Sequence, residues 1–207
     1  MEVLDKVRAY IKTNPEAAKR ILILLVILVV GLPAGLWYIR SAEERAYAFF
    51  TQGYYAYRNR NYGQAAGQFN QLVSLHPNSK FAALGRYYLG MTHLANNNVD
   101  EAAGQFKYFI DESGRHYLRE RVFTIWMALE LNAGRTENCV SLADRFLTEF
   151  GRTSSSSPEV LYRKGVALLR LGRADEAGAS FKEAAESKEN NIFGSLAFYA
   201  QTARPQL

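Results

Sequence analysis

Cysteine and histidine are scarce in this chain of 207 residues, which has one cysteine and three histidines. A single cysteine cannot form a disulfide within the chain, so no disulfide framework holds the fold. A lone thiol in a helical pattern most often serves as a small apolar side chain, and we therefore expect Cys139 to lie in the core. The histidines, His76, His93 and His116, lie in different segments without metal-ligand spacing, so we predict no metal site.

Catalytic motifs are missing as well. The sequence has no H-E-x-x-H helix, no Walker loop, no G-x-G-x-x-G fingerprint and no G-x-S-x-G elbow. The acidic pairs at residues 100–101 and 175–176 suit the first turn of a helix, where the helix dipole favours negative charge. We therefore expect no catalytic residues, no cofactor and no small-molecule substrate, and an enzyme is only the third of our hypotheses.

The net charge is small outside the N-terminal segment. The formal net charge of +5 includes a basic excess in residues 1–20 and at Arg40, whereas residues 41–207 carry 19 basic and 17 acidic side chains. A nearly neutral domain lacks the electrostatic footprint of a phosphate-binding protein, so we expect no nucleic-acid partner. The apolar content of 48% is that of a folded chain.

One long uncharged run is present, Ile21 to Ile39, with the sequence ILILLVILVVGLPAGLWYI. At about 1.5 Å per residue this run would span roughly 28 Å, close to the hydrocarbon thickness of a bilayer. Trp37 and Tyr38 fit an interfacial aromatic belt. The alternative is a cleaved secretory signal, whose apolar core is usually shorter and ends at small residues. We favour an uncleaved, single-pass transmembrane helix over residues 21–40.

The flanks of this run indicate its orientation. More Lys and Arg residues precede the run than follow it closely, which favours a cytoplasmic N-terminus. Residues 41–207 would then lie outside the cytoplasm, in the periplasm if the host is a Gram-negative bacterium, and the expected location is a bacterial inner membrane. Apolar residues recur at helical spacing within residues 1–20, which suits a short amphipathic helix on the bilayer. A frayed, solvated terminus is the alternative.

Two glycines inside the run favour a helix partner. Gly31 and Gly35 have the GxxxG spacing, which lets two membrane helices approach closely. We therefore predict a helix-helix contact at these residues. Pro33 lies between them and offers the alternative of a local kink.

The rest of the chain contains near copies of one stretch. These are YGQAAGQF at 62–69, VDEAAGQF at 99–106 and ADEAGASF at 174–181. Aligning them makes three sets of residues equivalent, namely Ala65, Ala102 and Ala177; Phe69, Phe106 and Phe181; and the earlier Gly53, Gly90 and Gly165. The same frame places Cys139 at the alanine position of another copy, so the copies recur every 37 or 38 residues. The pattern resembles the tetratricopeptide repeat, whose usual period of about 34 residues would here be extended by linkers.

The hydrophobic periodicity supports this resemblance. Each copy divides into two stretches with helical spacing of apolar residues, separated by turns at 58–61, 96–98, 132–135 and 171–173. We therefore predict an all-α fold, in which a single N-terminal transmembrane helix precedes a tetratricopeptide-repeat solenoid of helical hairpins.

The repeat positions have an expected packing role. Glycine and alanine are small where the two helices of a hairpin cross, and the phenylalanine fills the gap against the next repeat. The third copy is degenerate, with Met127 at the glycine position and Ala143 at the phenylalanine position. We expect about four repeats over residues 41–191, with a capping helix and tail over residues 192–207.

The resemblance to tetratricopeptide repeats also implies a groove lined by the first helix of each hairpin. The residues of this sequence that the resemblance places in the groove are Tyr47, Phe50, Tyr54, Tyr57, Tyr87, Met91, Leu94, Arg121 and Tyr162. Such a groove suits an extended or helical peptide, and tyrosines provide stiff contact area with a polar tip. The alternative is that some of these side chains only pack against one another or against the segment that follows the span.

An N-terminal anchor followed by such repeats resembles the YfgM-like family of ancillary translocon subunits. The resemblance implies a non-enzymatic, membrane-anchored scaffold that presents a protein-binding or peptide-binding groove to a translocon, chaperone or envelope-assembly complex. The alternative is a structural accessory subunit of a large membrane complex, with the groove permanently filled. In both hypotheses the partners are proteins and the lipid bilayer.

Overall fold

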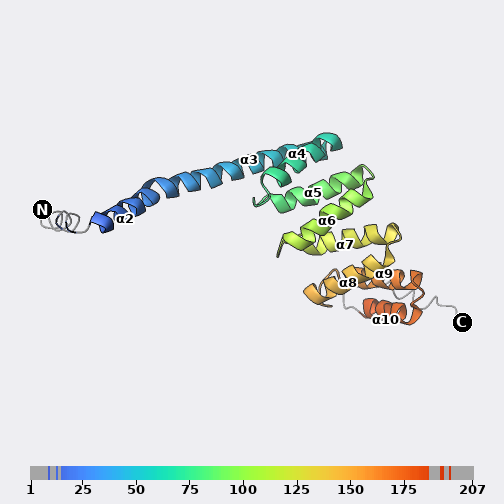
Figure 1. Cartoon of the computed structure of the whole chain (residues 1–207). Coiled ribbons are helices and arrows are strands. Elements are labelled where there is room, and N and C mark those ends of the chain that lie inside the picture. Colours follow the sequence, from blue (N-terminus) through green and yellow to red (C-terminus); the bar gives the residue numbers. More distant parts are fainter. Residues whose placement is uncertain (1–8, 10–12, 14, 187–191, 194–195, 197–207) are drawn as a thin grey trace.

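A long N-terminal helix leads into a stack of helical hairpins in the computed structural model (Figure 1), which describes residues 9, 13, 15–186, 192–193 and 196. The all-α fold predicted from the sequence is thereby confirmed. The elements are α2 (Pro15–Val26), the π-helical turn η1 (Ile27–Gly31), α3 (Leu32–Arg58), α4 (Tyr62–Leu75), α5 (Ala82–Ala95), α6 (Val99–Glu112), α7 (Arg119–Asn132), α8 (Thr136–Phe150), α9 (Ser157–Arg170) and α10 (Ala174–Ala185). Most of the predicted amphipathic segment, residues 1–20, lies outside the described residues.

The elements α2, η1 and α3 form one uninterrupted helix. Pro33 explains the π-helical turn, because it lacks an N–H and its ring crowds the carbonyl four residues earlier. The backbone widens there, and the N–H of Leu32 bonds to the carbonyl of Ile27. The helical residues 19–58 contain a stretch that is, by length and composition, long and apolar enough to cross a membrane. No helix end separates the apolar run from the first hairpin, because α3 belongs to both.

The two helices of each hairpin are joined by turns of one geometry, at the places that the sequence predicts. In each turn one residue has a positive φ, which is 59° at Arg60, 61° at Asn97, 74° at Gly134 and 75° at Gly172. The N–H of the following residue bonds to a carbonyl five residues back, as in the Schellman motif. Glycine adopts this backbone conformation freely, whereas Arg60 must accommodate a Cβ atom.

The repeated glycine and phenylalanine meet inside each hairpin. A Cβ atom added to Gly53 would lie 2.7 Å from Cε1 of Phe69, and the ring of Phe69 is fully buried. The corresponding distances are 2.6 Å for Gly90 with Phe106 and 2.5 Å for Gly165 with Phe181. Only glycine leaves room for the ring at such a crossing. The ring therefore packs first on the glycine of its own hairpin, and Phe69 also reaches the next repeat by stacking on Tyr88 at 5.8 Å.

The third hairpin reverses this arrangement of large and small residues. Met127 occupies the glycine position on α7 and Ala143 the phenylalanine position on α8, and both side chains are fully buried in the same apolar cluster. The bulk thus comes from the first helix instead of the second. The degenerate copy keeps a filled core by exchanging which helix supplies the volume.

The hairpins stack because the second helix of each one packs on the first helix of the next, as α4 does on α5, α6 on α7 and α8 on α9. Cys139 is fully buried in this stack, as expected, and burial raises the pKa of its thiol to about 11. Of the expected capping helix, the structure describes Ile192, Phe193 and Leu196. The ring of Phe193 lies 6.0 Å from that of Tyr162 on α9. The remainder of residues 191–207 lies outside the described residues.

Candidate functional site

Four of the predicted groove residues, Phe50, Tyr54 and Tyr57 on α3 and Tyr87 on α5, belong to an aromatic cluster centred on Tyr88. Its neighbours, with the distances between ring centroids, are Phe50 at 5.9 Å, Tyr54 at 5.2 Å, Tyr57 at 5.6 Å, Phe69 at 5.8 Å and Tyr87 at 5.1 Å. Aromatic pairs of this kind stabilise a fold beyond the area that they bury. The cluster holds the first hairpin against the second.

Exposure divides the predicted groove residues into three groups. Tyr47 is 55% exposed and Arg121 is exposed, whereas Tyr87 is only 8% exposed. The others are half-buried, namely Phe50, Tyr54, Tyr57, Met91, Leu94 and Tyr162. Nε of Arg121 donates a hydrogen bond to the hydroxyl of Tyr87 at 3.3 Å, which joins α7 to α5. The groove remains a prediction, and its accessible side chains are Tyr47, Arg121 and the half-buried edges.

Tyr88 is the central residue that sequence reasoning missed. Successive residues on a helix point about 100° apart, so Tyr87 and Tyr88 cannot face the same neighbour. Tyr87 packs in the larger apolar cluster with Phe106, while Tyr88 packs against the first hairpin. The adjacent pair of tyrosines is the feature of the sequence that could have indicated this role of Tyr88. Burial raises the pKa of the Tyr57 and Tyr88 hydroxyls, which therefore stay neutral at physiological pH.

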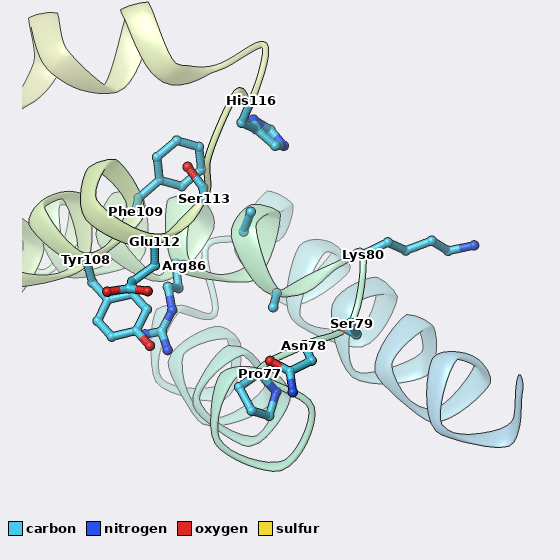
Figure 2. Close-up of a pocket in the computed structure, with 12 residues that line it drawn as sticks. Pro77, Asn78, Ser79, Lys80, Arg86, Tyr108, Phe109, Glu112, Ser113 and His116 are labelled. Carbon is cyan, nitrogen blue, oxygen red and sulfur yellow. The ribbon is translucent and has the colours of Figure 1, made fainter. Parts of the chain in front are cut away.

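A cavity of about 440 Å3 lies between the linker 76–81 and the linker 113–118 (Figure 2). The guanidinium of Arg86 sits 3.4 Å from the ring centroid of Tyr108, and Glu112 lies beside both (Figure 2). The hydroxyls of Ser79 and Ser113 are buried without a hydrogen-bond partner. Sequence reasoning did not find this cavity, because its lining comes from two linkers and two helices.

His116 and the neighbouring charges of Arg86 and Glu112 set the electrostatics of this cavity. Burial lowers the pKa of His116, which is therefore mostly neutral at physiological pH. Its Nδ1 accepts a hydrogen bond from the backbone N–H of Leu118 at 3.2 Å, so this nitrogen serves to hold the linker. Arg86 and Glu112 carry opposite charges, and their side of the cavity has little net charge.

A buried carboxylate also lies outside the predicted set. Glu130 is 3% exposed and accepts hydrogen bonds from Nε1 of Trp126 at 3.0 Å, Nε of Arg135 at 2.7 Å and Nδ2 of Asn138 at 2.9 Å. Burial alone would raise the pKa of Glu130, but these hydrogen bonds lower it below its ordinary value. Arg135 also bonds to Asp100 on α6 at 2.8 Å. The network is satisfied internally and joins the second hairpin to the third.

The two glycines predicted as a helix-helix contact are open in this chain. A Cβ atom on Gly35 would meet nothing within 4 Å, and one on Gly31 would meet only Cγ2 of Ile27 at 3.8 Å. The contact with a second membrane helix stays a prediction. Within the described part of the chain, no group of three or more His, Cys, Asp or Glu residues could hold a metal ion.

Solved structures share the fold. A tetratricopeptide repeat protein from Parabacteroides merdae matches with a TM-score of 0.64 and 14% identity over 76% of this chain and 59% of that one. The structure of MamA MSR-1 matches with a TM-score of 0.52 and 21% identity over 76% of this chain and 87% of that one. This chain thus matches only about three fifths of the first structure. A search of curated proteins finds no match.

The family model described as tetratricopeptide repeat matches residues 50–115 and 129–192, together more than half of the sequence. Both matched segments begin inside the first helix of a hairpin. Together they contain all three repeated Gly-Phe pairs. The stacked hairpins, their common turn geometry and this match agree with one another. The chain belongs to the tetratricopeptide-repeat family.

Proposed function

We propose that this protein is a non-enzymatic, membrane-anchored scaffold. In this proposal residues 21–39 span a bacterial inner membrane, the N-terminus is cytoplasmic, and the repeats bind protein partners in the periplasm. The observation that carries the proposal is the uninterrupted helix from the exposed apolar run into α3. A binding domain built on its own anchor is held close to the membrane, where a translocon, chaperone or envelope-assembly complex would meet it.

Tetratricopeptide repeats commonly bind peptides or protein segments, which supports a protein partner. The binding surface would lie on the side formed by the first helices. Tyr47 and Arg121 supply accessible side chains there, whereas the cluster around Tyr88 gives that side its rigidity. Rigid aromatic surfaces lose little conformational entropy when they bind.

The test is site-specific photocrosslinking of the full-length protein in its own membrane. A photoreactive residue at position 47 or 121 should capture partner proteins, whereas one at Gln71, exposed on α4, should capture fewer. Equal capture at all three positions would move the binding surface away from the first helices. A single stoichiometric product would favour the alternative function, a structural accessory subunit of a large membrane complex.

The anchor itself requires a separate measurement. The intact mass of the membrane-extracted protein should include residues 21–39. A product that begins near Arg40 would mean that the apolar run is a cleaved signal, and the anchored scaffold would then be excluded.

A further inference from the structure

The two ends of the hairpins differ in what they carry. One end bears the linkers between successive hairpins, residues 76–81, 113–118 and 151–156, and we call it the linker edge. The opposite end bears the tight turns within the hairpins. Figure 1 shows the first linkers on the side of the stack toward α2, because α4 runs back along α3 toward the apolar run.

The first linker lies close to the end of the apolar run. Glu43 is four residues after Ile39, a rise of about 6 Å along a helix. The backbone N–H of Lys80, within the linker, donates a hydrogen bond to Oε1 of Glu43 at 3.3 Å. The headgroup layer on each side of a bilayer is about 5–8 Å thick. The contact therefore puts this linker at headgroup depth if residues 21–39 span the membrane.

The second linker lies beside the first. Ser79 and Lys80 from the first linker line one cavity together with Ser113 and His116 from the second (Figure 2). The ring of Tyr117 stacks on that of His116 at 4.5 Å and is 77% exposed. The stacking holds Tyr117 at the surface of the linker edge.

The exposed side chains of these two linkers suit a lipid surface. Leu75, the last residue of α4 before the first linker, is 63% exposed, and Tyr117 is a residue type enriched at membrane interfaces. Lys80 and Arg115 are exposed, and neither forms an ion pair among the described residues. Basic side chains close to a bilayer are attracted by anionic lipids.

Most carboxylates on this edge are already engaged. Asp111 pairs with Lys107 and Arg145, and Glu149 pairs with Arg119. Oε1 of Glu43 accepts the hydrogen bond from the backbone N–H of Lys80, and its Oε2 is buried without a hydrogen-bond partner. Glu112 is exposed but lies beside Arg86 at the cavity (Figure 2). Within the first two linkers themselves, residues 76–81 and 113–118, the charged side chains are Lys80 and Arg115, and both are basic.

We propose that the linker edge of the first two hairpins rests on the headgroup layer of an anionic bilayer, with Lys80, Arg115 and Tyr117 in contact with the lipid. This inference rests on the proposed function, in which residues 21–39 span the same membrane. The stack of hairpins would then run along the membrane surface, and its turns would point away from the bilayer.

The test uses the full-length protein in nanodiscs that contain phosphatidylglycerol. An environment-sensitive fluorophore is attached at Tyr117→Cys or, as a matched control, at Ala133→Cys, in a Cys139→Ala background. Positions 117 and 133 flank the two ends of α7, which are separated by about 20 Å. Lipids with a spin label in the headgroup should quench most of the emission at position 117 and little of it at position 133. Equal quenching at the two positions, or none at position 117, would overturn the inference.

A fluorophore at Leu28→Cys separates this inference from the anchor. Lipids with a spin label in the acyl chain should quench it if residues 21–39 cross the bilayer. Quenching at position 28 without quenching at position 117 would leave the anchor intact and reject the lipid contact. No quenching at position 28 would reject the anchor, and the lipid contact with it.

Charge reversal tests the role of the basic residues. With Lys80→Glu and Arg115→Glu together, the quenching at position 117 in anionic nanodiscs should fall to the value in phosphatidylcholine nanodiscs. The control pair, Arg58→Glu and Arg60→Glu, reverses two exposed charges at the opposite end of α3 and α4 and should leave the quenching unchanged. Equal effects of the two pairs would reject the contact at Lys80 and Arg115.

Discussion

The ring of Phe69 occupies the place of the side chain that Gly53 lacks, since a Cβ atom on Gly53 would lie 2.7 Å from Cε1 of that ring. This relationship recurs with Phe106 and Phe181 and sets how closely the two helices of a hairpin cross. It explains why a glycine persists in the middle of a helix, where it otherwise costs stability relative to alanine.

The first prediction concerns this glycine. Gly53→Ala should lower the free energy of unfolding by about 1–3 kcal/mol, because the methyl group forces the buried ring to move. Gly67→Ala is the control, since a Cβ atom there meets nothing within 4 Å. The control should instead stabilise by about 0.5–1 kcal/mol. Denaturation of both variants in detergent, followed by circular dichroism, gives the comparison, and equal shifts would contradict the packing described.

The second prediction concerns the reversed third hairpin. Met127→Gly should cost about 2–5 kcal/mol through a cavity, and Ala143→Phe about 1–3 kcal/mol through overpacking. Together they recreate the Gly-Phe pair of the other hairpins, so the double variant should be more stable than the sum of the single changes implies. A double-mutant cycle measures this coupling. Strict additivity would mean that the two positions do not share one space.

The third prediction concerns the buried carboxylate. Glu130→Gln should lower the free energy of unfolding at pH 7 by about 1–3 kcal/mol, because the amide cannot accept all the hydrogen bonds of the carboxylate. The pKa of Glu130 is lower in the folded than in the unfolded chain, so its stabilisation is complete above the unfolded pKa and is lost as the pH falls through the folded one.

The difference between wild type and Glu130→Gln should therefore stay constant from pH 7 down to the unfolded pKa of a glutamate, and shrink as the pH falls from there toward the folded pKa. Urea denaturation at a series of pH values measures it, with the exposed Glu101→Gln as control. A difference that also stays constant below the unfolded pKa would argue against the carboxylate as its source.

The fourth prediction concerns the first turn. Arg60 has a φ of 59°, a conformation that costs a residue with a Cβ atom about 1–2 kcal/mol. Arg60→Gly should stabilise the protein by about 0.5–1 kcal/mol after the greater flexibility of glycine in the unfolded chain is subtracted. Gly134→Ala, at the equivalent turn, should destabilise it. Thermal melting of the two variants should shift in opposite directions.

The structural features that recur in the repeats could be predicted from the sequence, whereas those that occur once could not. Turn positions and the Gly-Phe register follow from periodicity, because every hairpin must present the same surface to its neighbour. The role of Tyr88 did not follow, because a pair of adjacent tyrosines does not say which one faces the preceding hairpin. The network of Glu130 was missed since Arg135 and Asp100 are 35 residues apart, and since the positions equivalent to Glu130 in the other repeats are Ala56, His93 and Leu168.

The boundary at residue 40 illustrates a further limit. A charged residue after an apolar run indicates the end of a membrane segment, but it does not end a helix, and α3 continues to Arg58. Pro33 offered a local kink as the alternative to a helix-helix contact at Gly31 and Gly35. The backbone accommodates the missing N–H of Pro33 in a π-helical turn, which depends on the geometry of the surrounding carbonyls.

The unbroken helix from the apolar run into the first hairpin also fixes the orientation of one face of the apolar run relative to the stack of hairpins. Each residue of a helix turns the chain by about 100° and advances it by about 1.5 Å. The side of residues 21–39 on which Gly31 and Gly35 lie is therefore at a fixed angle, measured about the helix axis, to the direction in which the hairpins stack. A helix that packs on those glycines and a protein held by the repeats would therefore be bound at one fixed angle to each other about this axis. The insertion of a single residue in α3, between the glycines and the repeats, would change that angle by more than a quarter turn.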